Sequence, residues 1–281
     1  MKMKIIVDST FYLIPSFVKE NHIDVVPLNI IIDHKSYLDM QDISVDEVMK
    51  AFNDGKKVGT SQPSPLAFIE KFSKAEADGY EHILCMTLSS GVSGTFQAAM
   101  IAKAEYKGKI EVAVIDTLSA AIGAEMLVDI ALLYKEESFH QLVERLDKVK
   151  KQIGIYLSMQ NLNSLRISGR LNRVKATIGN LLHVKPIVEV AEGVLSINSK
   201  MRTERQVLEW MINRIKSDLK NVSTAKYIYV SHIHANERLQ RLLQYLEKEF
   251  PTIPIKIRDG ISSVIAVNIG YGGIGIAWGY E

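Results

Sequence analysis

The chain has 281 residues, 47% of them hydrophobic, and its 34 basic and 32 acidic residues leave a net charge of +2. That length is enough for one large or two ordinary globular domains, and the charge balance argues against nucleic acid or an anionic membrane as the main partner. The single cysteine, Cys85, excludes an intramolecular disulfide and, with an N-terminal apolar stretch too short for a signal-peptide core, indicates a cytoplasmic protein.

Strands and helices alternate along the first half of the chain. Apolar runs predict strands at 5–7, 25–32, 82–88 and 111–115. Ser44 and the pair Ser64-Pro65 are good helix starts, because serine caps a helix and proline suits its first position. Further helices are expected over 13–20 and from about 94 and 119. This βαβα order predicts a parallel sheet with helices on both faces.

The second half mixes hairpin-like and parallel elements. A charged helix ending near Lys151 is followed by an expected strand at 153–157 and then by a longer series, in chain order: helix 172–182, two strands within 184–199 joined by a turn at Glu192-Gly193, helix 203–219, strand 226–232, helix 235–249, strand 254–258, and strands near 263–268 and 274–279. We therefore predict an α/β protein with two α/β domains, residues 1–157 on a parallel sheet and residues 158–281 on a mixed sheet.

Four polar clusters stand at or near predicted strand ends: Asp8-Ser9-Thr10, Gly59–Gln62, Ser89–Thr95 and Asp116–Ser119. Helix capping alone explains most such loops, but the carboxyl ends of parallel strands meet at one edge, where ligands bind. The segment Ser89–Thr95 suits an anion, because backbone N–H groups, hydroxyls and a helix N-terminus gather there. It lacks the lysine and spacing of a triphosphate-binding loop.

Two other motifs carry less weight. Residues 270–275 spell GxGxxG, but only six residues follow, so the helix and acidic residue of a dinucleotide site are missing and a glycine-rich turn is predicted. Among the arginines of LRISGRLNRVK, Arg166 is a plausible surface charge, Arg173 is predicted to be solvated, and Arg170, between Gly169 and Leu171, is predicted to lie in a tighter setting.

Together these segments resemble the DegV family, bacterial fatty-acid-binding proteins that serve fatty acid kinase. The matching stretches run through the chain in order: IIVDST, VVPLNIII with YLDMQDIS, VGTSQPSP, TLSSGVSGTFQAA, VAVIDTLSAAIG, LNSLRISGRLN, IGNLLHVKPI, MRTERQ and the glycine-rich end. The pair TSQPS and SSGVSGT is the most specific part of the resemblance.

The resemblance implies one long-chain fatty acid between the two domains, with the C-terminal domain contributing to the acyl-chain pocket. Its carboxylate would contact Thr60 and Ser61 of TSQPS and Ser93 of SSGVSGT, supported by Gly94 and Thr95. Where the family commonly has a histidine, this chain has Asn268, whose amide donates a hydrogen bond but carries no charge. Arg170 and Arg202 match positions that the family keeps basic, and Arg202 is the candidate kinase-facing residue.

By this resemblance the protein is a carrier without a cofactor and not an enzyme by itself. It would present the carboxylate to a separate ATP-dependent fatty acid kinase, and the acyl phosphate would pass to an acceptor enzyme of phospholipid synthesis at the membrane. Two alternatives remain. A Ser-dependent lipid hydrolase or acyl transferase would use Ser93 and needs a general base beside it, for which the sequence offers no obvious residue. A fatty-acid sensor without a kinase partner is favoured by Asn268.

Overall fold

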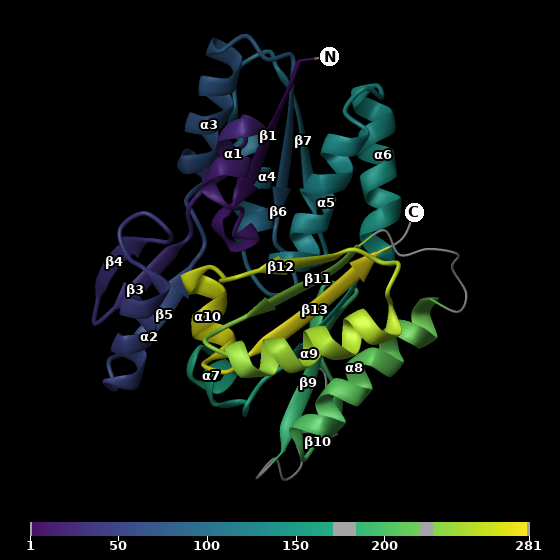
Figure 1. Cartoon of the computed structure of the whole chain (residues 1–281). Helices are drawn as coiled ribbons and strands as arrows, with labels where there is room; N and C mark the ends of the chain where they lie inside the picture. The colour runs from purple at the N-terminus through teal and green to yellow at the C-terminus, as the bar shows by residue number, and fades with distance from the viewer. Residues whose placement is uncertain (1, 171–183, 220–226, 280–281) are drawn as a thin grey trace.

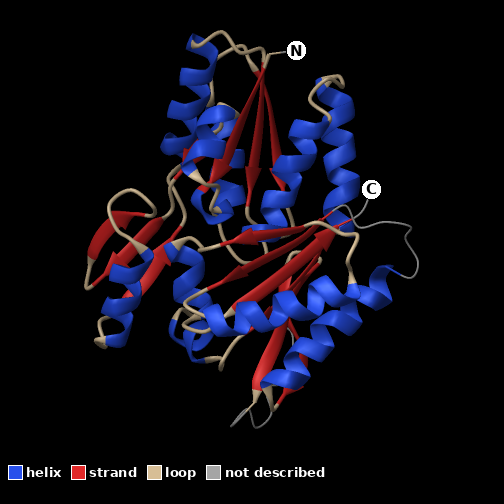
Figure 2. Cartoon of the chain, viewed as in Figure 1, coloured by secondary structure: helices blue, strands red, loops and turns tan. Residues whose placement is uncertain are grey.

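The structure is a computed structural model that describes residues 2–170, 184–219 and 227–279. Three sheets organise it (Figures 1 and 2): a parallel sheet, a six-stranded mixed sheet, and a small sheet beside them. The predicted helix 172–182, with Arg173, lies outside the described residues. The expected two-part α/β architecture with a parallel and a mixed sheet is confirmed.

The parallel sheet has the strand order β2-β1-β6-β7, and its strands are β1 (Met3–Asp8), β2 (Asp24–Val26), β6 (His82–Thr87) and β7 (Glu111–Asp116). Alternate residues of each strand face opposite sides of the sheet. Ile6, Ile83 and Cys85 pack against α3 (Pro65–Ala77) and α4 (Thr95–Glu105) on one face. The other face packs against α1 (Pro15–Glu20), α5 (Ala121–Leu133) and α6 (Phe139–Val149). Short 3₁₀ turns occupy Ser9–Phe11 and Lys150–Gln152.

The small sheet was not expected from the sequence. It has the order β4-β3-β5, formed by β3 (Asn29–Ile32), β4 (Lys35–Leu38) and β5 (Val58–Ser61), and α2 (Val45–Asn53) packs on it. The single strand predicted at 25–32 is therefore wrong, because β2 and β3 belong to different sheets. Pro27 separates them and has no N–H for a ladder, and the next N–H, of Leu28, bonds Ser9 Oγ at 3.1 Å.

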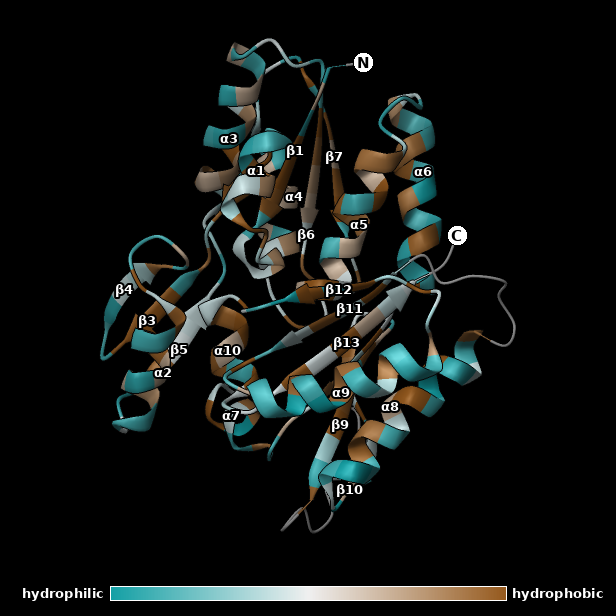
Figure 3. Ribbon diagram, in the orientation of Figure 1, coloured by the Kyte–Doolittle hydropathy of each residue, from teal (hydrophilic) through white to brown (hydrophobic). Residues whose placement is uncertain are grey.

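The mixed sheet has the order β10-β9-β8-β13-β11-β12, with β8 (Gly154–Ser158), β9 (Lys185–Ala191), β10 (Val194–Met201), β11 (Tyr227–His232), β12 (Ile255–Arg258) and β13 (Ile274–Gly279). The helices α8 (Glu204–Leu219) and α9 (Asn236–Glu249) cover one face, and both carry hydrophilic and hydrophobic residues, as surface helices do (Figure 3). The domain boundary expected after residue 157 falls inside β8, whose hydrogen bonds all belong to this sheet.

Two short helices stand near the junction of the sheets, α7 (Asn163–Ile167) and α10 (Ser263–Ile269). The strand predicted near 263–268 is wrong, since these residues form α10. An apolar run of this length does not distinguish a strand from a buried helix by its pattern. The helix is set by its ends: Ser262 Oγ accepts the N–H of Ile265 at 3.3 Å, and Gly270, at φ 80°, ends it.

Two buried carboxylates organise the loops at the end of the parallel sheet. Asp8 accepts hydrogen bonds from the N–H groups of Leu88 at 2.7 Å and Thr10 at 2.9 Å. Asp39 accepts from Ser9 Oγ at 2.7 Å and from the N–H of Ser263 at 3.0 Å. Burial raises the pKa of Asp8 to about 6 and raises that of Asp39. The segment Asp8-Ser9-Thr10 is thus structural.

The raised pKa of Asp8 predicts a pH-dependent stability. The folded state holds the proton more tightly than the unfolded state, so this group favours folding at low pH, and the effect is lost as pH rises through about 6. From pH 7 to pH 5 the free energy of unfolding of the parent should rise by about 1 kcal/mol relative to that of Asp8→Asn. Urea titrations of both proteins at both pH values measure this difference in the free energy of unfolding. Asp54→Asn, at an exposed position, is the control for the loss of a carboxylate. If the difference between the parent and Asp8→Asn is the same at pH 7 and pH 5, the pKa of Asp8 is not raised.

Candidate functional site

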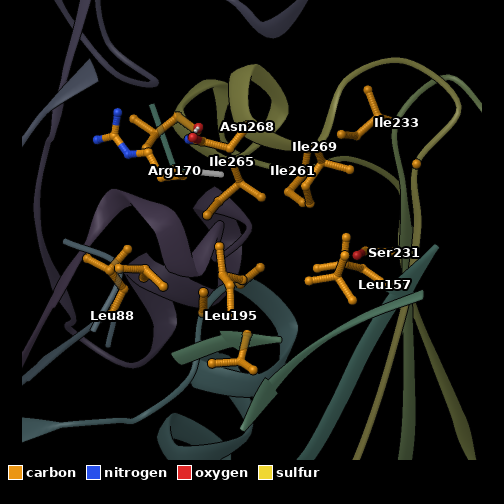
Figure 4. A pocket seen from close by; sticks show the side chains of 18 of the residues that line it. Leu88, Leu157, Arg170, Leu195, Ser231, Ile233, Ile261, Ile265, Asn268 and Ile269 are labelled. Atoms are coloured by element: carbon orange, nitrogen blue, oxygen red, sulfur yellow. Dashed lines mark hydrogen bonds between the residues drawn. The ribbon is translucent and has the colours of Figure 1, made fainter. Parts of the chain in front are cut away.

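A largely apolar cavity lies between the loop end of the parallel sheet and the face of the mixed sheet opposite α8 and α9 (Figure 4). The space between its walls, open mouth and adjoining solvent included, is about 1020 Å³. Its walls come from both halves of the chain: Leu28, Leu88, Ala121 and Ile122 on one side, and Leu157, Val188, Leu195 and Ile265 on the other.

Hydroxyl groups enter the cavity from the N-terminal half. Thr60 and Ser61 end β5, and Ser93 lies in the loop between β6 and α4; all three line the cavity and are half-buried. The structure therefore brings together the hydroxyl residues that the sequence analysis selected. The parallel-strand argument accounts only for Ser93, which follows β6; Thr60 and Ser61 come from β5 of the antiparallel small sheet, and neither Asp8–Thr10 nor Asp116–Ser119 lines the cavity.

Gly94 and Thr95 support this loop without lining the cavity. Ser93 Oγ lies 2.9 Å from Thr95 Oγ1 and accepts the N–H of Thr95 at 3.3 Å. Thr95, fully buried, is the first residue of α4, so the N-terminus of an eleven-residue helix stands next to Ser93. A Cβ on Gly94 would meet the Gln62 side chain at 3.0 Å, so the two hydroxyl-bearing loops approach closely here.

Ser89 ties the two halves together. Its hydroxyl, fully buried, donates to the carbonyl oxygen of Gly193 at 2.6 Å, in the turn between β9 and β10. A Cβ on Gly91 would collide with the same carbonyl group. The glycine is needed for this close approach, and the serine therefore closes the cavity and does not bind its contents.

Asn268 reaches the cavity from α10. Its Nδ2 donates to the carbonyl oxygen of Val264 at 2.7 Å, one turn back in the same helix. Its Oδ1 is buried and has no hydrogen-bond partner among the described residues. This bond uses one of the two amide hydrogens, so the side chain keeps one donor and one acceptor for a ligand.

The two arginines selected from the sequence lie in different settings. Arg170 lines the cavity, and its Nη1 donates to the carbonyl oxygen of Ser168 at 2.6 Å. In Figure 4 it stands near Asn268 at one end of the view. Arg202 follows β10, is exposed, and does not line the cavity; its backbone N–H bonds Gln206 Oε1 at 3.0 Å.

The sequence analysis missed His232, which ends β11, is 5% exposed and lines the cavity. Its Nδ1 accepts the N–H of Ala235 at 3.2 Å, and its Nε2 lies 3.1 Å from Asp259 Oδ1. Both ring nitrogens are thus engaged, and neither is left to take a proton from a serine. The signal that could have revealed His232 is its place at the end of the apolar run 227–231.

The described residues contain no group of three or more histidine, cysteine, aspartate or glutamate side chains able to hold a metal ion. Among the helices of the same residues, none has the length and apolar character needed to cross a bilayer.

A larger side chain placed in the cavity should weaken the binding of apolar small molecules there. A Cβ on Gly275 of β13 would lie 3.5 Å from Ser231 Oγ and 3.8 Å from Ile122 Cδ1, both ordinary contacts. The variant Gly275→Leu should therefore fold. Its affinity for an apolar fluorescent dye should be about tenfold lower than that of the parent, because the leucine side chain takes the space of roughly two methylenes of the bound dye. Dye titration measures this, with Gly59→Leu as control, where nothing lies within 4 Å of a Cβ. Equal dye affinity in both variants would refute the cavity as the binding site.

Comparison with known proteins agrees with this architecture. The chain is 33% identical over 280 residues to a DegV domain-containing protein of Listeria innocua, covering 99% of this chain and 98% of that protein. A DegV family protein of Thermus thermophilus, described as fatty acid binding, matches with a TM-score of 0.88 and 26% identity over the whole of both chains. A fatty acid binding DegV family protein of Streptococcus agalactiae matches with a TM-score of 0.89 and 25% identity, covering 100% and 99%.

A more distant match, at 21% identity and a TM-score of 0.82 over the whole of both chains, is the fatty acid kinase B3 protein of Streptococcus pneumoniae loaded with linoleic acid, which shares the fold. The model of the DegV family matches residues 2–281. From this match and the relatives, the chain belongs to the DegV family.

Proposed function

We propose that the chain binds one long-chain fatty acid in the cavity between its two halves. The observation that carries this proposal is an apolar cavity lined by the hydroxyl residues Thr60, Ser61 and Ser93 and by Asn268, whose amide oxygen has no partner among the described residues. The binding of fatty acids by the DegV family proteins of Thermus thermophilus and Streptococcus agalactiae supports it.

Apolar burial supplies most of the affinity in this proposal. Each methylene removed from water contributes about 0.8 kcal/mol, and the walls are mainly Ile, Leu and Val. The head group lies among the hydroxyls of Thr60, Ser61 and Ser93, with Gly94 and Thr95 holding the N-terminus of α4 beside it. Hydrogen bonds to a carboxylate are charge-assisted, and a helix N-terminus favours negative charge.

We propose a carrier that performs no chemistry on its ligand. A hydrolase using Ser93 needs a free base, and His232, which shares the cavity, has both ring nitrogens engaged. By the family resemblance, a separate fatty acid kinase would phosphorylate the carboxylate and an acceptor enzyme would take the acyl phosphate. Arg202, exposed and outside the cavity, remains the candidate residue for the kinase contact, and Arg170 supports the head group.

The proposal predicts that the purified protein carries about one fatty acid, which denaturing extraction and mass spectrometry would detect.

Thr60→Ala and Ser93→Ala should each weaken fatty-acid binding about tenfold or more, because each removes a charge-assisted hydrogen bond of about 1.5–3 kcal/mol. Ser90→Ala is the matched control, since Ser90 belongs to the same loop but is exposed. Parental affinity in the double variant would show that the head group lies elsewhere.

Asn268 should add little pH dependence to the fatty-acid affinity of the parent protein. Between about pH 5.5 and 8 an amide stays neutral, whereas a histidine titrates near ~6.5. Asn268→His should bind tighter on the acidic side of that range, and Asn268→Ala weaker throughout, after correction for ionisation of the ligand. Binding titrations at several pH values test this, with exposed Asn213→Ala as control. If Asn268→Ala binds as the parent does, Asn268 takes no part in binding.

A further inference from the structure

The floor of the cavity is a row of residues that are register partners across the mixed sheet. Val188 of β9 pairs with Leu157 of β8, Leu157 with Gly275 of β13, and Gly275 with Ser231 of β11, and all four line the cavity. Neighbouring strands lie about 4.8 Å apart, so the row is about 14 Å long. A ligand on this floor crosses the strands.

The hydroxyl loop and Ser231 stand at opposite ends of this row. Val92, next to Ser93, packs against the apolar cluster that contains Val188 and Leu157, toward the β9 end. Ile122 and the small residue Gly275 stand at the other end, beside Ser231. In Figure 4, Arg170 and Asn268 lie on one side of the view and Ser231 on the other. Ser231 therefore meets the distal part of an acyl chain whose head group lies beside Ser93.

Ser231 is an exception to its apolar surroundings. It is 3% exposed, it lines the cavity, and its Oγ has no hydrogen-bond partner among the described residues. When a ligand fills the cavity, a hydroxyl at its wall that is left without a partner is unfavourable, and an unsubstituted alkyl chain offers none. Because a serine hydroxyl both donates and accepts, an alcohol or ketone oxygen on the chain satisfies it.

We propose that the cavity selects fatty acids that carry an oxygen substituent, a hydroxyl in the first instance, in the distal half of the chain, and that Ser231 is the specificity-determining residue. This inference rests on the proposed fatty-acid binding. The head group contributes equally to plain and hydroxylated chains, so the selectivity comes from the hydrogen bond at Ser231 alone.

The test compares the parent with Ser231→Ala, using stearic acid and a positional series of hydroxystearic acids. In the parent, the isomer whose hydroxyl reaches Ser231 should bind about three- to tenfold tighter than the other isomers, the range of one net hydrogen bond. Ser231→Ala should lose that preference and bind stearic acid at least as tightly as the parent. Ser231→Thr keeps the hydroxyl and should keep the preference, and Ser93→Ala should weaken all the acids by the same factor.

The failures are distinguishable. Equal affinity of the parent for every isomer, or a preference that survives in Ser231→Ala, overturns the role of Ser231 while fatty-acid binding stands. Absence of binding of any of these acids to the parent overturns the proposed function, and this inference with it. If Ser231→Ala does not fold, Ser231→Val takes its place in the comparison: loss of the positional preference supports the role of Ser231, and a retained preference overturns it.

Discussion

The carboxylate of Asp39 is buried and contacts Ser9, 30 residues away in the sequence, and Ser263, 224 residues away. One oxygen accepts the hydroxyl of Ser9, and the other accepts the N–H of Ser263 in the first turn of α10. Each of these buried donors would be unsatisfied without the carboxylate, at a cost of about 1–3 kcal/mol apiece. The position of α10, and with it that of Asn268, depends on this one side chain from the opposite half of the protein.

A second set of contacts fixes the distance between the sheets. Ser89 donates to the Gly193 carbonyl oxygen from the hydroxyl loop, and Arg258 of β12 pairs with buried Glu125 of α5. Lys256 of the same strand pairs with Asp129 one turn further along α5. The cavity therefore has walls from both halves that are held by directional bonds, and its width does not depend on apolar contact alone. Such preorganisation reduces the ordering that a ligand must impose when it binds.

The polar groups around the cavity fall into two chemical kinds. Asp8, Asp39, Ser89 and His232 have their hydrogen bonds met within the protein and serve the architecture. Asn268 Oδ1 is buried without a partner among the described residues. Ser231 also lines the cavity, from the other end, and none of the hydrogen bonds within the described residues involves its hydroxyl. A binding protein needs the second kind at its ligand, whereas a catalyst would also need a free base, which His232 does not provide.

The alternation of elements and most strand and helix positions could be predicted from the amino-acid sequence, because hydrophobic period and helix caps are local properties. Thr60, Ser61 and Ser93 were selected together only through the family resemblance, since β5 lies in the antiparallel small sheet and not at an end of the parallel one. The division of 25–32 between two sheets, the helix at α10 and the place of β8 were not predicted. Pro27 marks the break in 25–32, but the sheet that each part joins is set by partners distant in the sequence. The hydrogen bond from the N–H of Ser263 to Asp39 and the pairing of β8 with β13 likewise form only when distant segments meet. The orientation of the Asn268 amide and the row that ends at Ser231 were likewise decided by tertiary structure, since hydrogen-bond partners and cross-strand register are properties of neighbours in space.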